Sequence, residues 1–261
     1  IQAADISMVN QETPFTTNHD LVSGTSPYAT PSEIGDALVN AGFNVVTSAT
    51  SLINDNGSSM INETLNYWKS NHPEVTLAGI HSSQTSTDSP QIVEVNGIKI
   101  AFLDYTFPEY GSQQTDAGDG STDSSFDSSD GSGDSSSGGT SDGSGDGSSS
   151  SSDSSGSTTG SGSMIDTFST TTVAAAIKKA RASADCIIFS ANWGKTEEPM
   201  PTEYEKEWAN FLMEQGVDVV IGTNPNVLQP YGYLTDDSGH NMLIYYSLGN
   251  FVTGQETLKH L

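Results

Sequence analysis

Residues 111–163 limit what this chain can fold into more than any other segment does. They consist almost entirely of Gly, Ser, Thr and Asp, with no Lys or Arg and with Phe126 as the single aromatic residue. Such a composition buries too little apolar surface to offset the entropy cost of ordering the backbone. We therefore predict a disordered insertion at 111–163, which divides one domain into a first part at 1–110 and a second part at 164–261.

The chain is acidic well beyond this insertion. Its formal net charge is -25 at pH 7, and outside 111–163 there are 24 acidic residues against 8 basic ones. An acidic surface repels phosphate backbones and anionic lipids, so we expect no nucleic-acid partner and no binding to membrane surfaces. No apolar run approaches the roughly 20 residues of a membrane span. The sequence starts at Ile1 without an initiator Met, and we expect a chain truncated at both ends that lacks an N-terminal targeting or anchor segment.

Before the insertion, β-rich runs alternate with helix signals. A helix is predicted at 30–42, with Thr30 as its N-cap and Gly42 just beyond its end. A second helix is predicted at 58–71, where apolar residues recur at helical spacing. The predicted strands are residues 5–10, 43–49, 75–80 and the two arms of a hairpin that turns at Asn96-Gly97.

After the insertion, the same alternation continues. Helices are predicted at 172–183 and 200–216, and Thr202 followed by Glu205 has the spacing of a capping box. This order of elements predicts an α/β fold, specifically a layered α-β-β-α sandwich with mixed sheets. The predicted strands of this part are residues 185–192, 217–222, and the arms of a second hairpin at 228–235 and 241–251.

Polar residues follow four of the predicted strands. Asn10 and Glu12 come after the first strand, and three further groups lie at 49–57, 191–198 and 222–226. The C-terminal ends of strands converge on one side of an α/β sheet. We therefore expect these residues to line one ligand-binding cleft.

The segments VNQETP, DNG, NWG followed by PMPTEYE, GVDVVIGTNPNVLQP and YYSLGNF resemble the CapA-type capsule synthesis (poly-gamma-glutamate biosynthesis) family. The resemblance covers nearly the whole chain outside the insertion, and the last three segments together make it specific. Proteins of that family are similar in fold to calcineurin-like metallophosphatases. The resemblance therefore implies a metallophosphatase-like sandwich.

In this family, motifs that read approximately N-x-E, N-H-x-x-D-x-G, H-W-G-x-E and G-T-H-P-H supply the ligands of a dinuclear metal site. Asn10 and Glu12 match the first motif, Asp55 matches the second and Trp193 matches the third, whose Glu is displaced by one residue to Glu197. The departures fall on the metal-ligand motifs: Ser51 and Leu52 stand in place of Asn-His, and Asn192, Asn224 and Asn226 stand in place of His.

These departures remove the donors that a transition metal needs. Zinc, manganese and iron bind imidazole or carboxylate groups, whereas Asn offers a neutral carbonyl oxygen and Leu52 offers no donor. The pattern implies no resident cofactor, no assignable catalytic residue, and a metal site that is degenerate. The alternative is that Asn224 and Asn226 are turn residues and not replaced metal ligands, because asparagine tolerates left-handed backbone conformation.

Two functions follow from the resemblance. The first is a catalytically inactive domain that acts as a binding or scaffold module at the bacterial cell surface, with a capsule or cell-wall polymer or the proteins of a biosynthesis complex as partners. The second is a metal-dependent hydrolase of phosphoester or related bonds, whose oxygen ligands hold Mg, Ca or Mn. The expected cleft is lined by Asn10, Glu12, Asp55, Asn192, Glu197, Asn224 and Asn226, with Trp193 either as an apolar wall or packed in the core.

Overall fold

The computed structural model describes residues 1–82, 90–107 and 164–253. These residues belong to one compact unit, formed by Ile1–Gln113 and Ser161–Leu261. The predicted insertion lies outside the described residues, so its disorder and the predicted domain boundaries stay predictions.

The first part of the chain forms a parallel three-stranded sheet with the strand order β1-β4-β5. The strands are short: β1 is Met8–Asn10, β4 is Val45–Thr47 and β5 is Thr76–Ala78. Parallel neighbours need a crossover connection. Two helices serve as these connections, α1 (Glu33–Ala41) between β1 and β4, and α2 (Ser58–Asn71) between β4 and β5.

Helix α2 has the predicted bounds, and its apolar face packs into the core. Ile61 and Trp68, seven residues apart, are both buried, as expected for positions on one face of a helix. The Trp68 ring lies 5.5 Å from the ring of Phe15 in β2 (Phe15–Thr16). Its indole N–H donates a 3.0 Å hydrogen bond to Gln11 Oε1, which satisfies the one polar group of this buried side chain.

Helix α1 begins later than its sequence predicts. The sequence favours Thr30 as the N-cap, but Thr30–Pro31 forms strand β3, which pairs in parallel with β2. The Thr30 N–H donates to Pro14 O and the Ser32 N–H donates to Thr16 O, so this segment bonds to a neighbouring strand before the helix starts at Glu33. The predicted end is confirmed, because Gly42 closes the helix with a φ of 103°.

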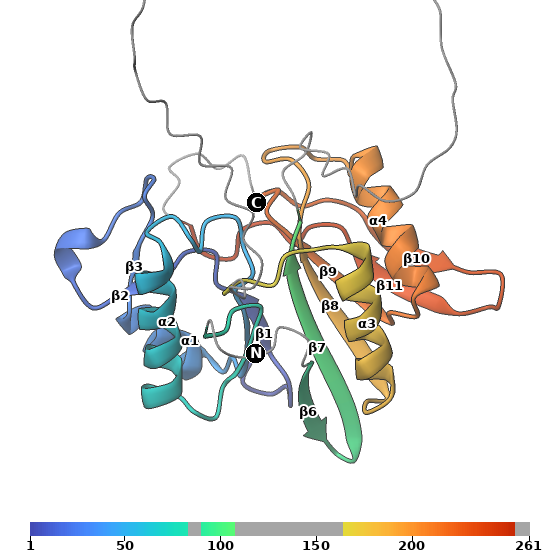
Figure 1. Cartoon of the computed structure of the whole chain (residues 1–261), viewed down its shortest axis with the longest axis horizontal. Helices are drawn as coiled ribbons and strands as arrows, with labels where there is room; N and C mark the ends of the chain where they lie inside the picture. Colours follow the sequence, from blue (N-terminus) through green and yellow to red (C-terminus); the bar gives the residue numbers. More distant parts are fainter. Residues whose placement is uncertain (83–89, 108–163, 254–261) are drawn as a thin grey trace, which may run out of the picture. The chain divides into compact units, whose positions relative to one another are not determined.

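The rest of the unit is built on a mixed six-stranded sheet (Figure 1). An antiparallel hairpin lies at each edge, β6 with β7 and β10 with β11, as predicted from the Asn96-Gly97 and Asp236–Gly239 turns. The four strands between the outermost two, β7, β8, β9 and β11, run parallel. In sheet order the strands are β10 (Tyr231–Thr235), β11 (Asn241–Tyr245), β9 (Val219–Thr223), β8 (Cys186–Asn192), β7 (Ile98–Thr106) and β6 (Gln91–Val95).

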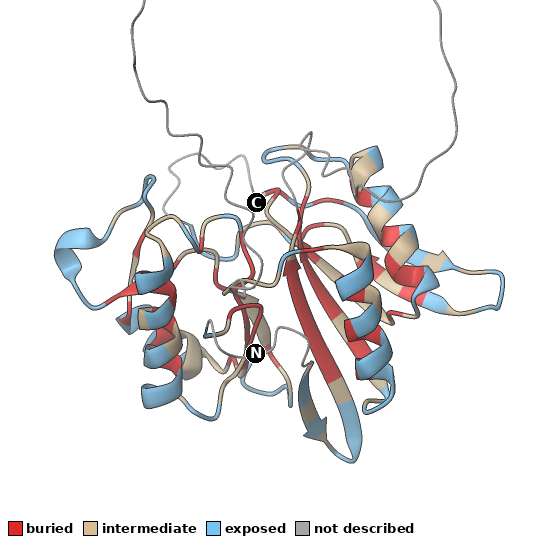
Figure 2. Ribbon diagram, viewed as in Figure 1, coloured by how far each residue is buried: buried red, intermediate tan, exposed pale blue. Residues whose placement is uncertain are grey.

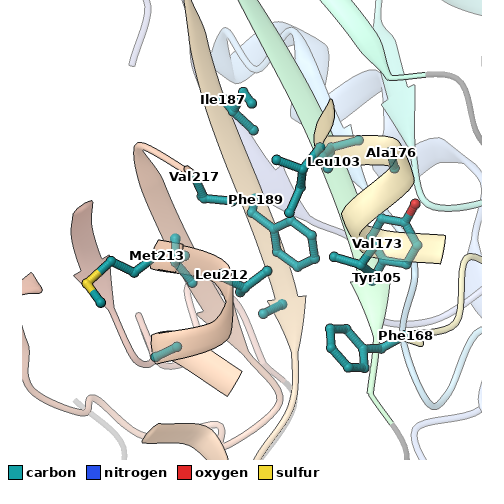
Figure 3. Close-up of a cluster of buried hydrophobic side chains, with 14 of the residues drawn as sticks. Leu103, Tyr105, Phe168, Val173, Ala176, Ile187, Phe189, Leu212, Met213 and Val217 are labelled. Carbon is teal, nitrogen blue, oxygen red and sulfur yellow. The ribbon is translucent and has the colours of Figure 1, made fainter. Parts of the chain in front are cut away.

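Helices α3 (Thr170–Arg181) and α4 (Glu203–Glu214) cover one face of this sheet. Their apolar residues interdigitate with alternate residues of the strands, including Phe189, which Figure 3 shows between the two helices. The central strands are accordingly the most buried part of the unit (Figure 2). The predicted capping box of α4 is confirmed, with Thr202 and Glu205 bonded reciprocally. None of the helices in the described ranges is both long and apolar enough to cross a membrane.

The unit is thus an α/β fold with a parallel three-stranded sheet, a mixed six-stranded sheet and the short parallel pair of β2 and β3. The two larger sheets are in contact through β5 and β7. Because successive side chains of a strand point to opposite faces, residues 103 and 105 of β7 face the helices. Residues 104 and 106 of the same strand face away from α3 and α4. That second face carries the polar side chains of Asp104 and Thr106.

Candidate functional site

The C-terminal ends of several strands bring polar side chains together. Asn192 is the last residue of β8, and it lies level with Thr106 at the end of β7 and Thr223 at the end of β9. Asn10 ends β1 and pairs with Thr47 at the end of β4. We call these five residues, together with Glu12, the amide-carboxylate cluster. Of the residues that the sequence predicts for one cleft, Asn10, Glu12 and Asn192 are linked to one another here through Glu12.

Glu12 lies at the centre of the cluster, with each carboxylate oxygen bonded to a side-chain amide. Asn10 Nδ2 donates to Oε2 and Asn192 Nδ2 donates to Oε1 at 3.2 Å. Asn10 Oδ1 in turn accepts a 3.2 Å bond from the hydroxyl of Thr47. Burial raises the pKa of Glu12, and the hydrogen bonds from Asn192 and Asn10 partly oppose that rise.

Asn192 uses the full hydrogen-bonding capacity of its side chain. Besides Glu12, its Nδ2 donates to Thr223 Oγ1 at 3.1 Å. Its Oδ1 accepts from the backbone N–H of Ser51 at 3.1 Å and, more weakly, from Thr106 Oγ1 at 3.4 Å. A primary amide has two donors and two acceptor positions, so nothing is left unpaired on this side chain, which is only 3% exposed.

The segment after β4 closes over the cluster through its backbone. Ser51 contributes its N–H group to Asn192, although its side chain is exposed. Thr50 Oγ1 donates a 2.6 Å hydrogen bond to the carbonyl oxygen of Glu12. Leu52 is half-buried, and its carbonyl accepts from the N–H of Asp55. The degenerate position at Ser51 therefore contributes to the cluster through a peptide group.

Asn224 and Asn226 both have left-handed backbone, with φ of 89° and 63°. Both residues therefore have the backbone conformation that the turn-residue alternative predicts. Histidine is enriched in the same region of backbone space as asparagine, so this conformation fits either residue type. Asn224 Nδ2 donates to the carbonyl oxygens of Trp193 at 3.0 Å and Gly194 at 3.2 Å, which ties the loop after β9 to the loop after β8.

Trp193 is a core residue rather than the wall of a cleft. Its side chain is 2% exposed, its ring lies 5.4 Å from the ring of Phe107, and its N–H donates to Tyr246 O at 3.0 Å. Of the two placements that sequence left open for Trp193, packing in the core is the one found. The indole is consequently not available to stack on a ligand.

Two of the predicted carboxylates have other surroundings. Asp55 Oδ2 accepts a 3.2 Å bond from the N–H of Tyr28. Glu197 is exposed, and its backbone N–H donates to Pro225 O at 2.8 Å. Among the hydrogen bonds of the described residues, neither side chain bonds to the amide-carboxylate cluster.

The residues present do not fit a dinuclear transition-metal site. Within the described ranges, no three His, Cys, Asp or Glu side chains are grouped so that they could hold an ion. The carboxylate oxygens of Glu12 face amide N–H groups, and Asn192 Oδ1 faces an N–H and a hydroxyl. A cation would compete with these donors for the same oxygen atoms.

The sequence prediction missed Thr47 and Thr106 of the cluster and a second polar layer below it. Asp104 and Ser190 precede Thr106 and Asn192 by two residues on the same strand faces, and both are buried. The available signal was an acidic residue within the otherwise apolar run of β7. Each threonine of the cluster is the last residue of its strand. The alternation of apolar and polar residues does not distinguish such a position from a solvent-exposed strand end.

Residues 1–255 match the family described as bacterial capsule synthesis protein PGA_cap. The PGA biosynthesis protein CapA of Bacillus subtilis (strain 168) is 30% identical over 79 residues, which is 30% of this chain and 20% of that protein. The capsule biosynthesis protein CapA of Bacillus anthracis is 31% identical over 75 residues, which is 29% of this chain and 17% of that protein.

The matched stretches thus span a fifth or less of these curated relatives. Among solved structures, a hypothetical protein from Thermus thermophilus aligns over 95% of this chain and 66% of its own chain. The TM-score is 0.47 and the sequence identity is 12%. At that level of similarity, nothing about the chemistry of the site follows from the match.

Proposed function

The chain belongs to the bacterial capsule synthesis protein PGA_cap family, and from this membership we propose that it acts in capsule biosynthesis as a non-catalytic binding or scaffold module at the cell surface. As part of this proposal, the fold is a metallophosphatase-like α-β-β-α sandwich that has given up its metal chemistry. The support for the layering is that α3 and α4 pack on one face of the large sheet while the small sheet contacts β7.

The observation that carries the proposal is that an amide N–H faces each carboxylate oxygen of Glu12. A hydrolytic metal centre needs anionic or imidazole lone pairs directed at the ion. Here the amide nitrogens of Asn10 and Asn192 are directed at the carboxylate instead. An amide N–H is a donor and competes with a cation for the same oxygens. The cluster is therefore suited to hydrogen bonding and not to polarising a phosphoryl group through an ion.

The ligand class follows from the strand-end groups that are not fully buried, which are Asn10, Glu12, Thr106 and Thr223. Amides, hydroxyls and a carboxylate recognise hydroxyl-rich or amide-rich chains by hydrogen bonding. A capsule or cell-wall polymer has such groups, and so does poly-gamma-glutamate. The charge of the chain opposes an anionic polymer unless a cation bridges the two, so we expect binding of poly-gamma-glutamate to require a divalent cation. Proteins of the biosynthesis complex are the other class of partner.

Metal analysis and hydrolysis test the absence of catalysis. We expect the purified chain to contain no stoichiometric zinc, manganese or iron and to leave bis(p-nitrophenyl) phosphate intact. A variant that combines five changes should gain a bound transition metal; these are Ser51→Asn, Leu52→His, Asn192→His, Asn224→His and Asn226→His. Stoichiometric Mg, Ca or Mn together with turnover by the wild-type chain would replace this proposal with the metal-dependent hydrolase.

Calorimetric titration tests the binding role. We expect poly-gamma-glutamate with calcium, or a neutral capsule glycan, to bind the wild-type chain and to lose up to about tenfold in affinity with Asn10→Ala, since one hydrogen bond between neutral groups contributes about 0.5–1.5 kcal/mol. Asn241→Ala is the matched control, because Asn241 is exposed on the β10-β11 hairpin. Equal loss in both variants, or no binding of either polymer, would contradict the assigned site.

A further inference from the structure

The layer beneath the amide-carboxylate cluster contains a buried acid that connects the two sheets. Asp104 on β7 is 2% exposed. Its Oδ2 accepts two backbone hydrogen bonds, from Ser48 N at 2.8 Å and from Ala49 N at 2.7 Å. Ser48 directly follows β4, so this one carboxylate oxygen joins the mixed sheet to the end of a strand in the parallel sheet.

These two bonds hold the start of the segment that closes the cluster. Within three residues of Ser48, the Thr50 hydroxyl donates to Glu12 O and the Ser51 N–H donates to Asn192 Oδ1. A shift of the backbone at Ser48 and Ala49 therefore moves both contacts. Asp104 does not touch Glu12 or Asn192 in any of these bonds, so its influence on the cluster acts through the segment 48–51.

The second oxygen of Asp104 has different surroundings. Oδ1 is buried, as are the hydroxyl oxygens of Ser48 and Ser190, and none of the three has a hydrogen-bond partner among the described residues. The Ser190 hydroxyl nevertheless lies close enough to lower the pKa of Asp104. A proton on Oδ1 would convert this oxygen from an acceptor into a donor.

The charges around Asp104 do not favour its ionised form. From the segment at 164–168, Asp166 faces it with a like charge that raises its pKa. His81, after β5, lies with Nε2 3.3 Å from Asp166 Oδ1, and burial lowers the pKa of that histidine. In the described part of the chain, the groups around Asp104 from the segment after β4 and from β8 are peptide N–H groups and the hydroxyls of Ser48 and Ser190. None of these groups is a cationic side chain.

We propose that Asp104 is a proton-controlled positioning residue, which holds the segment 48–51 against Glu12 and Asn192 when ionised and loosens it when protonated. Charge-assisted hydrogen bonds are roughly twice as strong as neutral ones, so protonation weakens both bonds from the Ser48 and Ala49 N–H groups. The proton comes from solvent, binds Oδ1 and leaves the carboxyl neutral. Burial raises the pKa of Asp104 to about 7, which places the change near neutral pH.

Amide resonances of the full chain report this switch directly, without any ligand. We expect the Ser48 and Ala49 amide proton and nitrogen shifts to change together between pH 5 and pH 9 with one midpoint near 7, and the Ser51 amide to follow with a smaller change. Asp104→Asn should abolish the transition at all three amides. His81→Gln is the matched control; it removes the histidine that pairs with Asp166 and should leave a transition at Ser48 and Ala49.

Two results would overturn the proposal: no transition at Ser48 and Ala49 in this pH range, or a transition that persists in Asp104→Asn. If Asp104→Asn does not fold, Ser190→Ala provides the second variant. Loss of the Ser190 hydroxyl should move the midpoint to higher pH, and an unmoved midpoint would count against the proposal. Any effect of Asp104 protonation on ligand binding rests on the proposed function, whereas the pH titration of the amide resonances requires no ligand. Failure of the binding role and failure of the switch are therefore distinguishable.

Discussion

Asn192 and Glu12 are 180 residues apart in the sequence, and a 3.2 Å hydrogen bond from Asn192 Nδ2 to Glu12 Oε1 joins them. Asn192 ends a strand of the mixed sheet, and Glu12 follows a strand of the parallel sheet. The bond therefore fastens the two sheets at the site. It also gives Glu12 a neutral partner at an oxygen that a metal centre would direct toward an ion.

Replacing Asn192 with Leu should destabilise the protein strongly. The change removes the part-buried hydrogen bonds that Asn192 donates to Glu12 Oε1 and accepts from the Ser51 N–H, and a buried group left unsatisfied costs about 1–3 kcal/mol. We expect the free energy of unfolding in urea to fall by at least about 2 kcal/mol. Asn241→Leu on the exposed hairpin should change it by less than about 0.5 kcal/mol. Similar values for the two variants would show that the cluster contributes little to stability.

Gly222 should not tolerate a side chain. A Cβ at this position would overlap the carbonyl oxygen of Tyr246 and crowd Trp193 Nε1. Both neighbours are held, because Trp193 Nε1 donates to Tyr246 O. We expect Gly222→Ala to lower the free energy of unfolding by about 2 kcal/mol or more. Gly232→Ala in the same sheet is the control, since a Cβ there meets no atom within 4 Å, and thermal unfolding of the two variants distinguishes them.

Asn224 allows its turn role to be measured separately from its side-chain bonds. Its φ of 89° raises the conformational free energy of alanine but not that of glycine. Both substitutions remove the bonds to the Trp193 and Gly194 carbonyls. We expect Asn224→Ala to be less stable than Asn224→Gly by about 1 kcal/mol in chemical denaturation. Equal stability would show that the left-handed backbone is not what selects the residue at this position.

The buried carboxyl of Asp104 predicts a specific dependence of stability on pH. Its pKa is about 7 in the folded chain against an ordinary value of 3.8, so between these values the folded state holds a proton that the unfolded state has released. The stability contributed by this group is complete below about pH 4 and is lost as pH rises through 7. The loss amounts to at most about 4 kcal/mol.

Asp104→Asn cannot release this proton. Comparing its free energy of unfolding with that of the wild-type chain cancels the contributions of Glu12 and Glu205, whose pKa values are also raised by burial. We expect the wild-type chain to lose stability relative to Asp104→Asn from pH 4 to pH 8. A difference that is constant over this range, or that changes in the opposite direction, would contradict the raised pKa.

Several elements followed from the sequence because their causes are local. The α2 bounds, the α4 capping box and both hairpins depend on residues within a few positions of one another, and all are found as predicted. Within each sheet, parallel strands end on the same side, which the predicted order of elements already implied. The family also followed, because its motifs are contiguous stretches of sequence and the match covers residues 1–255.

Only the tertiary structure decided which of the candidate residues act together. Thr30 carries a good helix-start signal, yet its N–H bonds to Pro14 and the segment forms a strand. Trp193 lies in a polar motif but is buried against Phe107. Asp104 belongs to the apolar strand β7, and its partners Ser48 and Ala49 are more than 50 residues away. The physical reason is that a hydrogen bond or a buried contact depends on two groups of the chain meeting in space, and local propensity contains no information about a partner outside the local stretch.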